Sequence, residues 1–158
     1  ACELDAVLTS FDAMLGKPVL FDTVFIDAPC SGTGTMRRHP EIPWRLTEKD
    51  VTFELPRLQL TMLKEAAARV VAGGELIYAT CSVFDEENTQ VVDAFLASPE
   101  GADFTVAPLS EAQILQLPEF AQAKKLVSVR QNDRGLFQSV PVNADSHDGH
   151  FCARLVRK

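Results

Sequence analysis

The fold is decided by the stretch VLFDTVFID, Val19–Asp27, and by the stretch ELIYA, Glu75–Ala79. Each is a short apolar run with β-branched or aromatic residues, and polar residues follow it, as expected for a strand buried in a parallel sheet. Between them, Glu54–Ala72 has apolar residues at helical spacing, with Pro56 near its first turn and Gly73–Gly74 after its end. This order predicts a βαβ unit and therefore an α/β fold.

The βαβ unit also predicts where ligands bind. Two parallel strands joined by a crossover have their carboxyl ends at the same edge of the sheet, which is where open α/β sheets bind ligands. The residues after Asp27 and after Ala79 are therefore expected to lie close together.

Further elements are predicted on both sides of this unit. Asp85 has the character of a helix N-cap, and acidic residues follow it in the first turn, so a helix is expected over Asp85–Leu96. An earlier strand is expected over residues 6–13, ending at Asp12. In the C-terminal third, we expect an antiparallel pair of strands at a sheet edge, with loop elsewhere; the ranges are Phe104–Ala107 and Phe151–Val156 for the strands and Pro108–His150 for the loop.

Composition narrows the class of protein. The 158 residues are 46% apolar and 23% charged, which is typical of one globular domain spanning residues 1–158. No apolar run reaches the ~18 residues of a membrane span, and the N-terminus does not resemble a secretory signal, so we expect a cytoplasmic protein without membrane contact. A net charge of -7 argues against binding nucleic acid over the whole surface. Any such contact must be local.

The cysteines do not form a metal site. They stand at positions 2, 30, 81 and 152, with no CxxC pair and no nearby cluster of histidines, so no zinc or other metal is expected. In a reducing compartment they are expected to be free thiols. Cys2 and Cys152 are interpreted as packing residues, because an isolated cysteine is most often buried for packing.

Cys30 and Cys81 have a different context. They lie in the segments DAPCSGTG, Asp27–Gly34, and YATCS, Tyr78–Ser82, each at the carboxyl end of a predicted strand. The topology is expected to bring both thiols into one crevice. A cysteine phosphatase loop is excluded, because its arginine position holds Met36, and a P-loop is excluded because no lysine follows the glycines.

These motifs resemble the signature of the RNA cytosine-5 methyltransferase family, in which an Asp-Ala-Pro-Cys-Ser-Gly-x-Gly strand end is followed by a Thr-Cys-Ser strand end. Further segments are similar to the family in the same order: Arg37–Arg45, Leu58–Leu60, Ala72–Gly74, Asp85–Asn88 and His147–Phe151. The resemblance implies a partial Rossmann-like, S-adenosylmethionine-dependent methyltransferase fold. It would comprise the later strands of a mixed sheet with an antiparallel C-terminal strand, and would lack the first strands.

The resemblance also implies a covalent mechanism on cytosine. Cys81 matches the family's nucleophile, which adds to C6 so that C5 can accept a methyl group from S-adenosylmethionine. Cys30 matches the second cysteine, which assists product release, and Asp27 would contact the N3 and N4 edge of the base. Cofactor contacts are expected from Asp12, at the adenine end, and from Asp27 and Pro29.

A local basic cluster, Arg37, Arg38 and Arg45, is predicted to contact RNA phosphates, although a solvated face is the alternative. Trp44 is expected either to stack on a base or to serve as a packing anchor. Ribosomal RNA is the first choice of substrate and transfer RNA the second.

The family's glycine-rich cofactor loop is not seen in this sequence, so the chain is expected to be a truncated catalytic domain that is inactive alone. A sheet without its first strands would expose an edge, which predicts a homodimer that covers it. Two alternatives stay open: a noncatalytic interaction or dimerisation module, and a thiol enzyme acting on another substrate.

Overall fold

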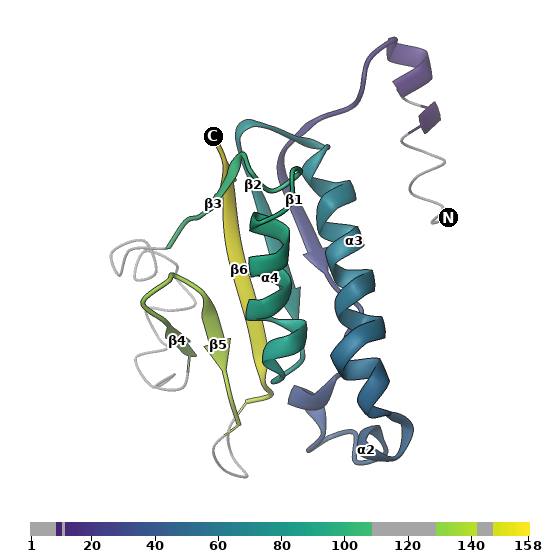
Figure 1. The fold of residues 1–158 in the computed structure, drawn as a ribbon, viewed down its shortest axis with the longest axis vertical. Helices are drawn as coiled ribbons and strands as arrows, with labels where there is room; N and C mark the ends of the chain where they lie inside the picture. The colour runs from purple at the N-terminus through teal and green to yellow at the C-terminus, as the bar shows by residue number, and fades with distance from the viewer. Residues whose placement is uncertain (1–8, 11, 109–128, 142–146) are drawn as a thin grey trace.

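The computed structural model describes residues 9–10, 12–108, 129–141 and 147–158. They form a six-stranded mixed sheet of order β1-β2-β6-β5-β4, in which β3 also pairs with β6 (Figure 1). The strands are β1 (Phe21–Asp27), β2 (Val70–Thr80), β3 (Phe104–Val106), β4 (Val129–Gln131), β5 (Phe137–Ser139) and β6 (His150–Arg157). The helices are α2 (Ile42–Arg45), α3 (Leu55–Ala67) and α4 (Thr89–Leu96), with a π-helix at Asp50–Glu54 and 3-10 turns at Thr33–Thr35 and Asp85–Glu87.

The predicted βαβ unit is confirmed. β1 and β2 pair in parallel, with Phe25 opposite Ile77 and Asp27 opposite Ala79, and α3 connects them. The two carboxyl ends therefore lie next to each other at one edge of the sheet.

Both α3 and α4 cover the same face of the sheet (Figure 1). Leu63 of α3 and Phe95 of α4 are completely buried and belong to one apolar core with Leu76, Tyr78 and other strand residues. Strand residues alternate between faces, and those on the opposite face are more exposed. Phe25 of β1, for example, is 61% exposed.

The boundary between α3 and β2 differs from the prediction. The helix ends at Ala67, and β2 begins at Val70 and not at Glu75. Gly73 has a φ of 78°, and the register between β1 and β2 shifts next to it, so the glycines form an irregularity within the strand where we expected a helix terminator. The two β-branched valines, Val70 and Val71, extend the strand on the N-terminal side.

The start of α4 also differs. Residues Asp85–Glu87 form a 3-10 turn, and α4 begins only at Thr89. Neither of these elements has a side-chain N-cap hydrogen bond, so the prediction of Asp85 as an N-cap was wrong. The backbone at Asn88 has φ -114° and ψ -98°, outside the helical region, which separates the two elements.

The predicted strand ending at Asp12 was wrong, because residues 12–15 are helical. The Asp12 carboxylate accepts a hydrogen bond from the Val19 N–H at 2.6 Å and pairs with Arg69 at 2.7 Å. Val19 and Arg69 lie just before β1 and β2, so Asp12 is at the amino ends of these strands, away from the cysteines. The helical backbone at residues 12–15 and the ion pair with Arg69 therefore explain the position of the Asp12 carboxylate.

The C-terminal third is more regular than expected. β3 and β6 form the predicted antiparallel pair, but β6 lies inside the sheet, between β2 and β5, and not at its edge. Strands β4 and β5 occur within the segment predicted as loop, and residues 109–128 and 142–146 of that segment lie outside the described residues. Among the described helices, none has the length and apolarity needed to cross a membrane.

Candidate active site with two cysteines

The carboxyl ends of β1 and β2 bring Cys30 and Cys81 into contact. Their Sγ atoms are 3.1 Å apart, and the Cys81 N–H donates a hydrogen bond to Cys30 Sγ at 3.3 Å. Both cysteines are free thiols and are partly exposed. The prediction that the two thiols meet at one edge of the sheet is confirmed. We call the two strand ends, residues 27–34 and 80–83, the two-cysteine site.

Backbone hydrogen bonds hold the strand ends together beyond the sheet. The Gly34 N–H donates to the Cys81 carbonyl at 2.9 Å, and the Gly149 N–H donates to the Gly34 carbonyl at 2.8 Å. A Cβ atom at position 34 would lie 2.1 Å from the Gly149 carbonyl oxygen and 2.8 Å from the Cys81 carbonyl oxygen. Only glycine therefore allows the three segments to approach this closely.

A buried polar network lies beneath the cysteines. The carboxylate of Glu87, which is 0% exposed, accepts hydrogen bonds from the Ser31 N–H, the Ser82 hydroxyl and the Gln59 side-chain amide. This network was not predicted from the sequence, in which Glu87 was interpreted as an acidic residue favourable in a first helical turn and as part of the family-like segment Asp85–Asn88. Its partners lie 5, 28 and 56 positions away, and no local pattern marks such contacts.

The surroundings of Cys30 favour the neutral form of its thiol. Burial, and secondly the hydrogen bond with Cys81, raise the pKa of Cys30 to about 12. Cys30 is therefore a neutral thiol at neutral pH, and its S–H can donate to Cys81 Sγ.

The other predicted site residues occupy different positions. Asp27, the last residue of β1, is exposed and pairs with Ala79, two residues before Cys81. Pro29 is exposed, and its carbonyl accepts a hydrogen bond from the Gln59 side chain at 2.9 Å. Asp12 is not brought to this site.

The predicted RNA-contacting arginines are in part engaged within the protein. The Arg38 guanidinium forms an ion pair with Asp148, which lowers the pKa of that carboxyl, and an Arg37 nitrogen lies 3.7 Å from the same carboxylate. These pairs join the loop after Cys30 to the start of β6. Arg45 ends α2 and is exposed, while Trp44 is 88% exposed, which excludes a packing role for its ring.

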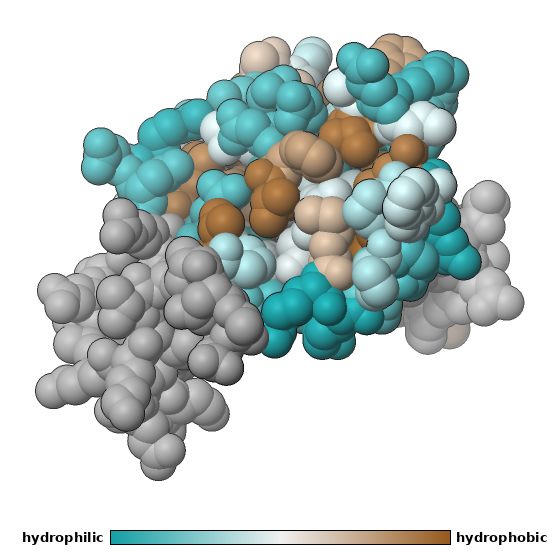
Figure 2. Space-filling view, turned by 90° about the horizontal axis from the view of Figure 1, so that it is seen from below, coloured by the Kyte–Doolittle hydropathy of each residue, from teal (hydrophilic) through white to brown (hydrophobic). Residues whose placement is uncertain are grey.

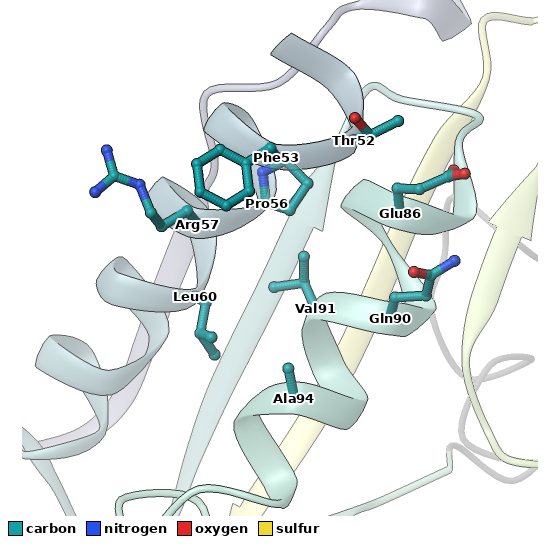
Figure 3. A pocket seen from close by; sticks show the side chains of 9 residues that line it. All are labelled: Thr52, Phe53, Pro56, Arg57, Leu60, Glu86, Gln90, Val91 and Ala94. Atoms are coloured by element: carbon teal, nitrogen blue, oxygen red, sulfur yellow. The ribbon is translucent and has the colours of Figure 1, made fainter. Parts of the chain in front are cut away.

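Two surface cavities lie at the end of the molecule where the two-cysteine site lies. One, of about 280 Å³, lies between the N-terminal part of α4 on one side and the π-helix with the N-terminal part of α3 on the other; Phe53, Leu60 and Val91 are among the residues that line it (Figure 3). The other, of about 330 Å³, is lined by residues of the loop after Cys30 and by Phe84. Figure 2 shows apolar surface between polar regions at the end where α2 lies. Exposed apolar side chains that line the two cavities include Met36, Phe53 and Phe84.

The sequence was compared with known proteins. The family model described as 16S rRNA methyltransferase RsmB/F matches residues 2–156. Ribosomal RNA small subunit methyltransferase B of Klebsiella pneumoniae subsp. pneumoniae is 44% identical over 140 residues, covering 87% of this chain and 26% of that protein. The enzyme of the same name from Salmonella arizonae is 38% identical over 139 residues, covering 87% and 27%. The chain thus spans about a quarter of the length of these relatives.

Solved structures share the fold of this chain. The crystal structure of PH0851 superposes with a TM-score of 0.64 at 35% identity, covering 85% of this chain and 26% of that one. NSun6 from Pyrococcus horikoshii superposes with a TM-score of 0.63 at 20% identity, covering 88% and 30%, and at this identity the likeness shows the fold alone. With the family model covering nearly every residue, the chain belongs to the 16S rRNA methyltransferase RsmB/F family.

Proposed function

We propose that this chain is the C-terminal part of the catalytic domain of an S-adenosylmethionine-dependent RNA cytosine C5-methyltransferase, with small-subunit ribosomal RNA as substrate and transfer RNA as the second choice. The observation that carries the proposal is the 3.1 Å contact between Cys30 Sγ and Cys81 Sγ at adjacent strand ends. Family membership supports the same reaction. All 158 residues would then belong to one domain.

Cys81 is the proposed nucleophile. C5 of cytosine is a weak nucleophile until a group adds across the neighbouring C6, and a thiolate can form that bond reversibly. The Sγ of Cys81 would bond to C6, which makes C5 nucleophilic. After C5 has accepted the methyl group, a base would take the C5 proton, and the electron pair of that C–H bond would re-form the C5–C6 double bond and expel Cys81 as a thiolate. The partial exposure of Cys81 is consistent with access of a base to its sulfur.

Cys30 and Asp27 are the proposed partners of Cys81. The S–H of Cys30 can donate to Cys81 Sγ in the resting site, and as a neutral thiol next to the reacting ring Cys30 would assist release of the product. Asp27 ends the strand beside Cys81, and its exposed carboxyl is suited to hydrogen bonding with the N3 and N4 edge of the base.

S-adenosylmethionine, when bound, supplies the electrophilic methyl group. This cofactor is a cation, and the residues present fit one part of it. The exposed Asp27 carboxylate can face the positive charge of the cofactor, and the exposed Pro29 is two residues away. Asp12 is not part of this proposal, because its carboxylate is bonded to Arg69 and the Val19 N–H. We expect the isolated chain not to turn over.

RNA contact is proposed for the basic cluster predicted from the sequence. Arg45 and the indole of Trp44 are exposed on adjacent residues of α2, so a phosphate and a base could be held side by side there. Arg37 and Arg38 would contribute positive potential while bound to Asp148.

A covalent trap tests the proposed reaction. RNA containing 5-fluorocytosine cannot lose a proton from C5, so the addition product is expected to accumulate when the protein, expressed at the full length of its gene, is mixed with this RNA and the cofactor. Peptide mapping by mass spectrometry should place the adduct on Cys81. Absence of an adduct, or an adduct on another residue, would refute the mechanism.

The second candidate function is a noncatalytic interaction or dimerisation module. Two observations favour it: β1 is an edge strand among the described residues, and Phe25 on its open face is 61% exposed. Titration calorimetry with S-adenosylmethionine separates the two candidates when the protein is expressed at the full length of its gene, because micromolar binding then favours an enzyme and no binding favours the module.

We expect a second copy of the chain to cover the β1 edge in solution. Light scattering coupled to size exclusion should then give twice the mass of the 17.3 kDa chain. Phe25→Lys is expected to return it to the single-chain mass, because a lysine on the open face opposes burial of that face. A single-chain mass for the unmodified protein contradicts the dimer.

A further inference from the structure

A buried carboxylate is one of the links between the two cysteine-bearing strand ends, together with the backbone hydrogen bonds and a hydrogen bond of 3.1 Å that the Ser31 hydroxyl donates to the Ser82 hydroxyl. Glu87 Oε2 accepts hydrogen bonds from the Ser31 N–H at 2.8 Å and from Gln59 Nε2 at 3.0 Å, and Oε1 accepts one from the Ser82 hydroxyl at 2.7 Å. Ser31 directly follows Cys30, and Ser82 directly follows Cys81. Glu87 thus contacts both loops one residue beyond each sulfur-bearing residue.

The same network holds the residue before Cys30. Gln59 uses its Nε2 group for both Glu87 and the Pro29 carbonyl, the latter at 2.9 Å, while its Oε1 is buried without a hydrogen-bond partner in the described part of the chain. Glu87 therefore orients Gln59, and Cys30 is bracketed by a contact to the Pro29 carbonyl and a contact to the Ser31 N–H.

The backbone carbonyl of Glu87 also has a buried partner. The Tyr78 hydroxyl, buried in the core, donates to the Glu87 backbone carbonyl at 2.6 Å, and Tyr78 and Glu87 are both 0% exposed. Burial of a carboxylate lowers the free energy of unfolding unless hydrogen-bond donors compensate the charge. A well-packed apolar side chain at the same position often stabilises a protein at least as much as the carboxylate does. Stability alone therefore does not explain a glutamate here.

We propose that Glu87 is a positioning residue for the two-cysteine site: its carboxylate joins the Cys30 and Cys81 loops and so sets the separation of the two sulfurs. The proposal deepens the proposed function and rests on it insofar as both sulfurs act on the same pyrimidine ring. Glu87 touches neither sulfur and is not a catalytic residue. Its effect passes through Ser31 and Ser82.

Two substitutions of Glu87 distinguish the effect of side-chain length from the effect of charge. Glu87→Gln keeps the length of the side chain, its oxygen can still accept from Ser31 and Gln59, and its amide can donate to the Ser82 hydroxyl oxygen. Glu87→Asp keeps the charge but is shorter by one methylene, about 1.5 Å, so it cannot contact both loops. A positioning role predicts a native site in the glutamine variant and a loosened site in the aspartate variant.

The rate of disulfide closure between Cys30 and Cys81 reports the sulfur separation without any need for methylation. Diamide takes two electrons and two protons from the thiols and becomes a hydrazine, while one S–S bond forms. Closure is followed by intact mass and peptide mapping, with Cys152 as the internal reference thiol. Glu87→Asp is expected to slow closure by about 10- to 100-fold, because such rates are sensitive to displacements near 1 Å. Glu87→Gln should close at nearly the native rate.

Two controls address stability and location. Tyr78→Phe removes the bond to the Glu87 carbonyl and lowers stability, but leaves the carboxylate contacts, so closure of its folded fraction should stay near native. Glu86→Gln changes the neighbouring carboxylate, which has no part in the network. Native closure in Glu87→Asp, with circular dichroism showing a folded chain, overturns the proposal, and so does slow closure in Glu87→Gln. If Glu87→Asp does not fold, slow closure in Glu87→Gln still overturns the proposal, and if Glu87→Gln does not fold, Glu87→Asp decides.

The methylation rate of the protein, expressed at the full length of its gene, gives an independent measurement. Glu87→Asp should lower kcat for cytosine methylation with little change in KM for RNA, and Glu87→Gln should restore it. If the protein does not methylate RNA but Glu87→Asp slows closure, the proposed function fails and the positioning role stands. If methylation is found and Glu87→Asp leaves the rate of disulfide closure unchanged, the proposed function stands and the positioning role fails.

Discussion

If Cys81 is the nucleophile, as proposed, its replacement by alanine is expected to lower the rate of cytosine methylation by on the order of 10⁴- to 10⁶-fold, the loss found when a nucleophile that acts as part of a unit is removed. The physical reason is that no other group in the site can form the bond to C6. The Cys30 sulfur, although 3.1 Å away, stays protonated because its pKa is raised to about 12. The measurement is methyl transfer to unmodified ribosomal RNA under single-turnover conditions, with the protein expressed at full gene length.

Two matched variants make this test specific. Cys152→Ala removes a partly exposed thiol that lies opposite Ala79 in β6, and it should leave methylation near the native rate. Cys30→Ala should allow the Cys81 adduct to form but slow its release, so that protein–RNA adduct accumulates. Retention of methylation by Cys81→Ala would show that the two sulfurs meet for another purpose.

Replacement of Gly34 by alanine is expected to destabilise the fold by about 3–5 kcal/mol, because overpacking and the loss of backbone hydrogen bonds add together. The new Cβ would lie 2.1 Å from the Gly149 carbonyl oxygen and 2.8 Å from the Cys81 carbonyl oxygen, and both contacts are to backbone that cannot move aside alone. The hydrogen bonds of Gly34 to Cys81 and to Gly149 would lengthen or break. Urea unfolding followed by circular dichroism measures the change.

Gly73→Ala is the matched control for this prediction. Its φ of 78° is unfavourable for alanine, but nothing lies within 4 Å of the added Cβ, so only the backbone cost of about 1–2 kcal/mol applies. A Gly34 variant no less stable than the Gly73 variant would mean that the three segments are not packed as described.

The order of the elements around the site could be predicted from the residues. The apolar run before Asp27 and the apolar run before Thr80 are typical of strands, and the spacing between them is typical of a helix. These local patterns predicted the parallel pair of strands and the meeting of their carboxyl ends, which the structure shows. Element boundaries could not be predicted as well. Gly73 and Gly74 are compatible with both a helix end and a strand irregularity, and only pairing with β1 decides between them.

Asp12 and Glu87 show where local patterns fail. A short polar residue after apolar ones suggested a strand end at Asp12, but its carboxylate is bonded to Arg69, 57 positions away. Glu87 had an adequate local explanation as a first-turn residue, which concealed its contact with Ser31, 56 positions away. Long-range partners of polar side chains leave no periodic trace in a sequence.

The sequence by itself determined which chemistry is present: two cysteines at two strand ends, an aspartate before one of them, and a chain with a βαβ core. Only the tertiary structure decided that the sulfurs are 3.1 Å apart, that Cys30 holds its proton, and that one buried carboxylate joins both loops. Strand and helix periodicity arise from neighbouring residues along the chain. Sulfur separation and burial arise from packing between segments far apart in sequence, which a linear pattern does not encode.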